Sequence, residues 1–173
     1  TQTWDAIYSN SGCLGRCWGV NNDVYSIVPN PVNGHLLMAG GQFALAAGQP
    51  ASRVATFHHR LGWSPLGKGF DGSVHALAVD AASQTFYAGG DFSASGTAAI
   101  DNLARWGGSA WSAMMGGTPR GADAPVYALQ FSSSRSSLTA GGDFSRMGSL
   151  AASRAARWNG SQWTALGSGL NGR

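Results

Sequence analysis

Polar side chains recur at one place in this chain, directly after paired glycines. Asp91 and Asp143 each follow such a pair, and Gln42 holds the same place after an earlier pair. A side chain that recurs in this way can coordinate calcium, face a sugar hydroxyl or cap a neighbouring backbone amide. Capping is the most ordinary of these roles, and we expect it here.

Two other carboxylates, Asp71 and Asp123, occupy equivalent loops of successive repeats. Hydrolysis of a glycosidic bond uses two carboxylates placed across a cleft, but this repetition only weakly suggests that arrangement. Turn formation is the role that we expect for both. The remaining charged residues of such loops show no paired arrangement; they are Arg16, Asp23, Lys68 and Arg120. The sequence therefore predicts no catalytic residues.

Few residues have the chemistry of metal ligands. His58 and His59 are neighbours in a predicted strand, where adjacent side chains point to opposite faces, so we expect that they do not share one ion. Cys13 and Cys17 are the only cysteines, four positions apart, and no His or further Cys lies near the pair. A local disulfide is favoured over a zinc site, and it would place the protein outside the cytosol. We expect no metal and no cofactor.

Two short motifs bear on phosphate binding and on modification. The glycine pairs end apolar segments and do not precede helices, so they are not phosphate-binding loops. Asn159-Gly160-Ser161 has the form of an N-glycosylation acceptor and lies in a predicted hairpin turn. In a eukaryotic secretory pathway we expect Asn159 to be modified.

The composition limits the class of protein. The chain has 173 residues, 43% of them hydrophobic and 11% charged, with 26 glycines. This balance is typical of β proteins with many turns. The net charge of +3 comes from basic residues scattered singly, so nucleic-acid binding is not expected. No apolar stretch approaches the ~20 residues of a membrane span.

The glycine pairs belong to a longer repeat of about 50 residues. The pairs are Gly40-Gly41, Gly89-Gly90 and Gly141-Gly142. Each pair ends an apolar segment, and another apolar segment precedes it, starting at Val24, Val74 or Val126. A third segment and then a segment led by Trp63, Trp111 or Trp163 follow the pair. Each unit therefore holds four short apolar segments in a fixed order.

Short polar turns separate these segments, as expected for hairpins. Four antiparallel strands in about 50 residues, repeated, are typical of a blade of a β-propeller. A strand position without a side chain lets neighbouring sheets approach near the axis, which explains the glycine pair. We expect the tryptophans to fill the wider outer gap between blades.

The pattern resembles the kelch type of propeller, the class that includes the central domain of galactose oxidase. It is more similar to the repeats of Rax2-like extracellular cortical marker proteins and related bacterial surface propellers. The similar motifs are Ala-Gly-Gly-Asp-Phe, then Asn-Leu-Ala-Arg-Trp, then a Trp-led strand that ends in Leu-Gly. The resemblance covers nearly the whole chain and implies the fold, whereas such propellers serve as scaffolds, lectins and enzymes.

We expect three blades and partial units at both ends. The predicted organisation is the last strand of a preceding blade at 1–9, a cysteine-bearing loop at 10–23, blades at 24–67, 68–116 and 117–167, and a lead-in to a further blade at 168–173. Closed propellers use about 4 to 8 blades. The chain is therefore expected to be a piece of a longer polypeptide, with a ring completed by several copies as the alternative.

A propeller usually builds its site from the loops that join the second strand to the third and the fourth strand to the next first strand. The loops of the first kind are predicted at 44–52, 93–101 and 145–153, and they consist mainly of Ala, Ser and Gly. They suggest no catalytic arrangement. The resemblance implies a non-catalytic extracellular scaffold or interaction module whose partners are other chains or the rest of a longer polypeptide. The alternatives are a carbohydrate-binding propeller and a fragment of a galactose oxidase-like enzyme.

Overall fold

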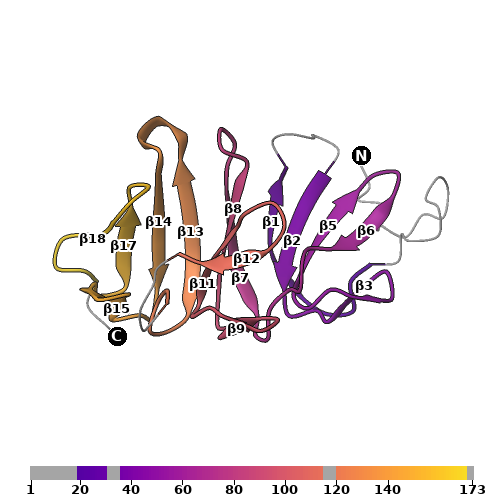
Figure 1. The fold of residues 1–173 in the computed structure, drawn as a ribbon, viewed down its shortest axis with the longest axis horizontal. Helices are drawn as coiled ribbons and strands as arrows, with labels where there is room; N and C mark the ends of the chain where they lie inside the picture. Colours follow the sequence, from indigo (N-terminus) through magenta and orange to yellow (C-terminus); the bar gives the residue numbers. More distant parts are fainter. Residues whose placement is uncertain (1–18, 31–35, 115–119, 171–173) are drawn as a thin grey trace, which may run out of the picture.

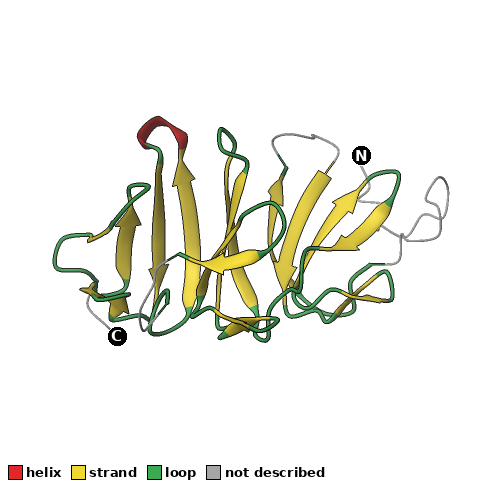
Figure 2. Ribbon diagram, viewed as in Figure 1, coloured by secondary structure: helices red, strands yellow, loops and turns green. Residues whose placement is uncertain are grey.

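The described part of the chain folds into β-strands joined by turns and loops. The computed structural model describes residues 19–30, 36–114 and 120–170. Within these ranges the only helical segment is the short 3-10 turn η1 (Ser133–Arg135). The strands form three four-stranded antiparallel sheets, which stand side by side along the long axis of the molecule (Figures 1 and 2). The prediction of an all-β chain with repeated four-stranded units is confirmed.

Each sheet is a meander in chain order. The first sheet contains β1 (Val24–Pro29), β2 (Leu36–Gly41), β5 (Val54–His58) and β6 (Gly62–Pro65). The second contains β7 (Val74–Asp80), β8 (Thr85–Gly90), β11 (Leu103–Trp106) and β12 (Trp111–Ala113). The third contains β13 (Val126–Ser132), β14 (Ser137–Gly142), β17 (Ala155–Trp158) and β18 (Trp163–Ala165).

The segments predicted as loops between the second and third strands contain additional strands. They form the two-stranded ribbons β3 (Leu45–Ala46) with β4 (Gln49–Pro50), β9 (Ala94–Ser95) with β10 (Ala98–Ala99), and β15 (Arg146–Met147) with β16 (Leu150–Ala151). The sequence did not reveal them because each strand has only two residues, mostly of types with weak strand preference.

The three sheets share one register and one irregularity. Val24 pairs with Gly41, and the next pair is Ser26 with Gly40, so Tyr25 is an extra residue in β1. The same shift makes His75 the extra residue of β7 and Tyr127 that of β13. Such a β-bulge bends the strand and redirects side chains.

The sheets approach one another along their first strands, since β7 packs against both β1 and β13. A Cβ atom added at Gly40 would lie 2.5 Å from Cγ1 of Val74 in the second sheet. At Gly89 it would lie 2.6 Å from Cγ1 of Val126 in the third sheet. These contacts are the close approach that the sequence predicted for the glycine pairs, and they involve the first glycine of each pair.

The second glycine of each pair has a different role, within its own sheet. A Cβ at Gly90 would collide with the carbonyl oxygen of Ser73, just before the bulge in β7. That carbonyl accepts a hydrogen bond from the Asp91 amide at 3.1 Å. Gly41 faces the Asp23 carbonyl and Gly142 the Pro125 carbonyl in the same way.

The tryptophans that lead the fourth strands, Trp63, Trp111 and Trp163, are buried. Trp111 packs in a core shared by the first two sheets, and its Nε1 donates a hydrogen bond to the Leu66 carbonyl at 3.1 Å. Trp163 belongs to the core shared by the second and third sheets. These two tryptophans therefore lie on outer strands and belong to cores that neighbouring sheets share, whereas the glycines mark the contact between inner strands.

Candidate functional site

The three bulge residues form one row of aromatic rings across the sheets. The rings of Tyr25 and His75 are stacked, with centroids 5.3 Å apart and planes 22° apart. His75 contacts Tyr127 on its other side at 5.1 Å, with an angle of 58° between the planes. We call Tyr25, His75 and Tyr127 the aromatic row. Each sheet contributes one member from its first strand.

The aromatic row is at least partly open to solvent, whereas the valines before its second and third members are not. Tyr25 is 45% exposed and Tyr127 is 49% exposed. Val74 and Val126, which precede the second and third members, are completely buried. The bulge separates the two environments, because its extra residue is released from the packed face of the strand.

A polar residue accompanies each ring, and it is the residue that follows the glycine pair of the same sheet. The Tyr25 hydroxyl donates a hydrogen bond to Oε1 of Gln42 at 3.0 Å. Nε2 of His75 lies 3.7 Å from Oδ2 of Asp91. Asp91 also accepts a hydrogen bond from the Ser73 amide at 2.6 Å, which is the capping role that the sequence predicted. Capping thus leaves its second carboxylate oxygen facing the row.

The third sheet gives the row an acidic end. Partial burial raises the pKa of the Tyr127 phenol, and the negative charge of Asp143, a hydrogen bond to that carboxylate and the charge of Asp91 raise it further. The phenol therefore stays protonated near neutral pH. Tyr127 and the two carboxylates together offer a ring face, a hydroxyl group and acceptor oxygens to a ligand.

These groups suit binding by stacking and hydrogen bonding. Aromatic faces pack against apolar surfaces, including the C–H faces of a ring, and they attract cations. Carboxylate and amide oxygens accept hydrogen bonds from hydroxyl or ammonium groups. Because each sheet contributes one ring and one polar residue, similar sites recur at regular intervals from one sheet to the next.

The two recurring loop carboxylates hold loops together. Asp71 Oδ1 accepts hydrogen bonds from the amides of Ser93 and Ala94, both at 2.9 Å, and its Oδ2 accepts one from the Ser93 hydroxyl at 2.6 Å. Asp123 binds the amides of Ser145 and Arg146 and the Ser145 hydroxyl in the same pattern. We call these contacts the loop clamps.

The first sheet has a neutral version of the clamp. Asn21 Oδ1 accepts hydrogen bonds from the amides of Ala44 and Leu45 at 2.9 and 2.8 Å. Burial acts to raise the pKa values of Asp71 and Asp123, but their hydrogen bonds outweigh it and lower both values. All three clamps join the segment before a first strand to the ribbon after a second strand. The contacts agree with turn formation as their role and leave these carboxylates outside the aromatic row.

His58 and His59 differ from the expectation based on an extended strand. Their ring centroids are 4.7 Å apart, because β5 ends at His58 and the chain turns there. Nδ1 of His58 accepts hydrogen bonds from the amides of Arg60 and Leu61, both at 3.2 Å. Among the described residues, no three His, Cys, Asp or Glu side chains gather in a way that could hold a metal ion.

The other predicted site residues are dispersed. Cys13, Cys17 and Arg16 lie outside the described residues. Asn159 is exposed in the β17–β18 turn, where its Oδ1 accepts hydrogen bonds from the Ser161 amide and hydroxyl, both at 3.0 Å. Lys68 borders a surface hollow of about 760 Å³ between the first two sheets. The Arg120 amide binds a carboxylate oxygen of Asp101 at 2.6 Å.

Sequence reasoning identified the polar half of the candidate site and missed its aromatic half. Gln42, Asp91 and Asp143 stood out because they follow the glycine pairs. The rings recur equally regularly, one residue after the valine of each first strand. That repetition is the signal in the sequence that could have identified them.

Comparison with family models and with curated protein sequences gives no match for this chain. No helix in the described ranges is long and apolar enough to cross a membrane. A function therefore has to be inferred from the aromatic row, the loop clamps and the stacking of the sheets.

Proposed function

We propose that this chain is part of a β-propeller and acts as a non-catalytic interaction module that binds its ligand at the aromatic row. Its three meander sheets have the same register and the same bulge, and their first strands pack closely, which supports blades arranged around an axis. The resemblance to kelch-type and Rax2-like repeats supports the same assignment.

One observation carries the functional part of the proposal. The aromatic row is a continuous set of ring contacts that joins all three sheets on their solvent side. Aromatic residues that remain exposed and in contact with polar groups are typical of recognition surfaces. The loop clamps fix the segments before the first strands of the second and third sheets, so the row is presented on a rigid support.

An extracellular or cell-surface location is part of the proposal. It is supported by the Rax2-like resemblance, by the spacing of Cys13 and Cys17, and by the exposed acceptor Asn159. For the protein secreted from a eukaryotic host, intact mass before and after glycosidase treatment tests modification at Asn159, with Asn159→Gln as the control. Thiol labelling without reductant tests the disulfide, because two reactive cysteines would contradict it.

Carbohydrate binding is the second candidate function, and the make-up of the row favours it. Each ring has a polar neighbour that can accept hydrogen bonds, namely Gln42, Asp91 or Asp143. A sugar presents an apolar C–H face and several hydroxyl groups, which match a ring face with an adjacent oxygen acceptor. Repetition once per sheet would make the binding multivalent.

Paired glycan and peptide arrays test the proposal. The labelled chain is applied to both arrays, and a variant that combines His75→Ala with Tyr127→Ala is compared with Leu61→Ala, which removes an exposed apolar side chain in the β5–β6 turn. We expect binding to be lost only in the double variant. Binding to glycans selects the carbohydrate candidate. No binding of the unaltered chain, or equal binding by the double variant, would contradict the proposed site.

A further inference from the structure

The two contacts between neighbouring sheets are built alike. Gly40 of the first sheet receives the side chains of Val74 and Leu77 from the second. Gly89 of the second sheet receives Val126 and Leu129 from the third. Each junction therefore has an acceptor half, made by a glycine, and a donor half, made by two apolar side chains of the next first strand.

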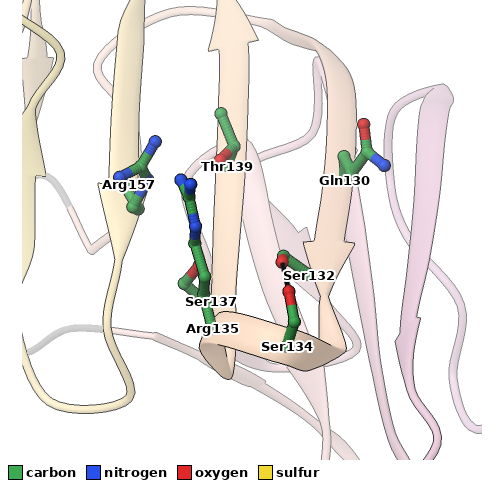
Figure 3. A pocket seen from close by; sticks show the side chains of 7 residues that line it. All are labelled: Gln130, Ser132, Ser134, Arg135, Ser137, Thr139 and Arg157. Carbon is green, nitrogen blue, oxygen red and sulfur yellow. Dashed lines mark hydrogen bonds between the residues drawn. The ribbon is translucent and has the colours of Figure 1, made fainter.

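The third sheet ends in an acceptor half against which none of the described residues of another sheet packs. Gly141 pairs with Ala128 just as Gly89 pairs with Ala76. An added Cβ at Gly141 would have its nearest neighbours 3.8 Å away, in Ala128 and Arg154 of its own sheet. The same face continues outward through Gln130, Thr139 and Arg157, which border an open hollow of about 400 Å³ (Figure 3).

The first sheet presents a donor half that likewise has no neighbouring sheet among the described residues. Val24 and Ile27 hold the positions of Val74 and Leu77 in the shared register. Val24 is 37% exposed and Ile27 is 57% exposed, whereas Val74 is fully buried and Leu77 is 5% exposed. Leu37 is also 37% exposed, although its equivalent Phe86 is buried. Apolar side chains thus cover this face at positions where other sheets use them for packing.

We propose that two copies of this chain associate head to tail, with Val24 and Ile27 of each copy packed against Gly141 of the other. Two such junctions close a ring of six sheets, which lies within the range of about 4 to 8 blades seen in closed propellers. The inference rests on the propeller architecture proposed above and does not depend on which ligand binds the aromatic row.

The polar residues on the free face of the third sheet are compatible with this junction. Arg157 pairs with Thr139 in β14 as Arg105 pairs with Tyr87 in β8. Arg105 is exposed even though the third sheet covers the inner part of that face. Arginine at this outer position therefore does not prevent a neighbouring sheet from packing.

Association would also extend the aromatic row. Within one copy, each ring contacts the ring of the next sheet. If the sheets pack across the new junction as they do within one copy, Tyr25 of the second copy lies beside Tyr127 of the first. Two copies would then form one circular row, to which each contributes three rings, so the candidate site would be complete only in the dimer.

Sedimentation equilibrium over a range of protein concentrations tests the proposal. We expect a mass of twice the 17.8 kDa of the chain. Gly141→Val should weaken the dimer at least about tenfold, because the new side chain occupies the space that Val24 and Ile27 would fill. Gly107→Val is the matched control, because Gly107 lies in the β11–β12 turn and a Cβ there has only one neighbour, at 3.9 Å.

A second variant, Ile27→Asp, tests the donor half and guards against misfolding of Gly141→Val, since Ile27 is already exposed in one copy. Each variant retains the half that the other lacks, so mixing them should restore one junction and give an open heterodimer. Pairing of two first sheets with each other would instead leave Gly141→Val dimeric. Circular dichroism confirms that each variant is folded.

An unaltered chain that remains monomeric at concentrations on the order of 100 µM would overturn the inference, as would a folded Gly141→Val variant that dimerises normally. These results differ from failure of the proposed function. A monomer that still binds an array through His75 and Tyr127 would refute the dimer only, whereas a dimer that binds neither array would refute the binding role only.

Discussion

At the residue scale, the loop clamps show how one geometry is built with two side-chain types. Asp71 and Asp123 use a carboxylate where Asn21 uses an amide oxygen, and all three accept two backbone amide hydrogen bonds. The aspartates also bind a serine hydroxyl, an interaction that strengthens with their negative charge. Because these contacts lower the pKa of both carboxylates, two of the clamps depend on pH.

We predict that acid weakens these two clamps. A carboxyl group with a lower pKa in the folded state than in the unfolded state stabilises the fold above its unfolded pKa. That stabilisation is lost as the pH falls below about 4 and through the folded values. The double variant Asp71→Asn and Asp123→Asn keeps the amide acceptor found at Asn21 but no longer titrates. Its urea midpoint should therefore fall less between neutral pH and acid than that of the unaltered chain, and parallel pH profiles would contradict the assignment.

Removal of a clamp should destabilise the fold at neutral pH. Asp71→Ala deletes the acceptor for two amides and a hydroxyl, and we expect a loss of roughly 1–2 kcal/mol in the free energy of unfolding. Asp71→Asn is the conservative comparison and should lose less, because Asn21 makes the amide bonds of an equivalent clamp. Equal losses in urea denaturation would mean that the charge, not the acceptor geometry, determines the effect.

At the element scale, the two glycines of each pair are needed for different contacts. The first lets the next sheet approach, and the second makes room for a carbonyl beside the bulge. The bulge also explains how Val74 and Leu77 both reach Gly40, although residues three apart face opposite sides of a regular strand. A single extra residue thus positions the junction on one side and the aromatic row on the other.

Gly89→Ala should therefore be destabilising. The added Cβ would lie 2.6 Å from Val126 Cγ1, so the second and third sheets would have to separate. We expect a loss of about 1–3 kcal/mol, typical of overpacking in a core. Gly107→Ala is the control and should change stability by no more than about 0.5 kcal/mol, because its Cβ would make only an ordinary contact, 3.9 Å from the Ala110 carbonyl oxygen. Thermal denaturation of the two variants in the same buffer measures the difference. Equal melting temperatures would contradict the close contact between the second and third sheets at Gly89.

The fourth-strand tryptophans allow a second matched comparison. Trp111 Nε1 donates to Leu66 across a junction, whereas Trp163 Nε1 is buried and has no hydrogen-bond partner among the described residues. Trp→Phe removes similar volume at both positions, but only at the first does it remove a hydrogen bond that the described residues make. Trp111→Phe should therefore lose about 1 kcal/mol more than Trp163→Phe in the free energy of unfolding. Urea denaturation measures the difference, and an equal or larger loss for Trp163→Phe would show that packing, not this bond, dominates.

The sequence predicted the elements better than it predicted the site. Recurrent glycines and tryptophans marked four strands per unit and the packing between sheets, because these residue types satisfy steric demands that repeat with the fold. The aromatic row depends on the pairing register of the first and second strands. The residue types from Val74 to Ala78 give no sign that His75 is an extra residue in β7. The ribbons were missed because their two-residue strands lack any periodicity.

At the scale of the whole molecule, stability should be greatest in the middle of the array. The second sheet packs on both faces, whereas the first and third each have one face without a neighbouring sheet among the described residues. In repeat architectures, contacts between neighbours supply much of the stability of each unit. The strands β7 and β13 give the clearest comparison, because both are first strands with the same bulge.

We predict that amide hydrogen exchange in dilute protein is slower in β7 than in β13. Both strands bond to one neighbour within their sheet, but four of the seven residues of β7 are buried and only one of the seven residues of β13 is. Local opening therefore disrupts more packing in β7. If copies associate through the third sheet, protection in β13 should rise with protein concentration while protection in β7 stays constant, and Gly141→Val should abolish that rise. Faster exchange in β7 than in β13 would contradict the packing on which both expectations depend.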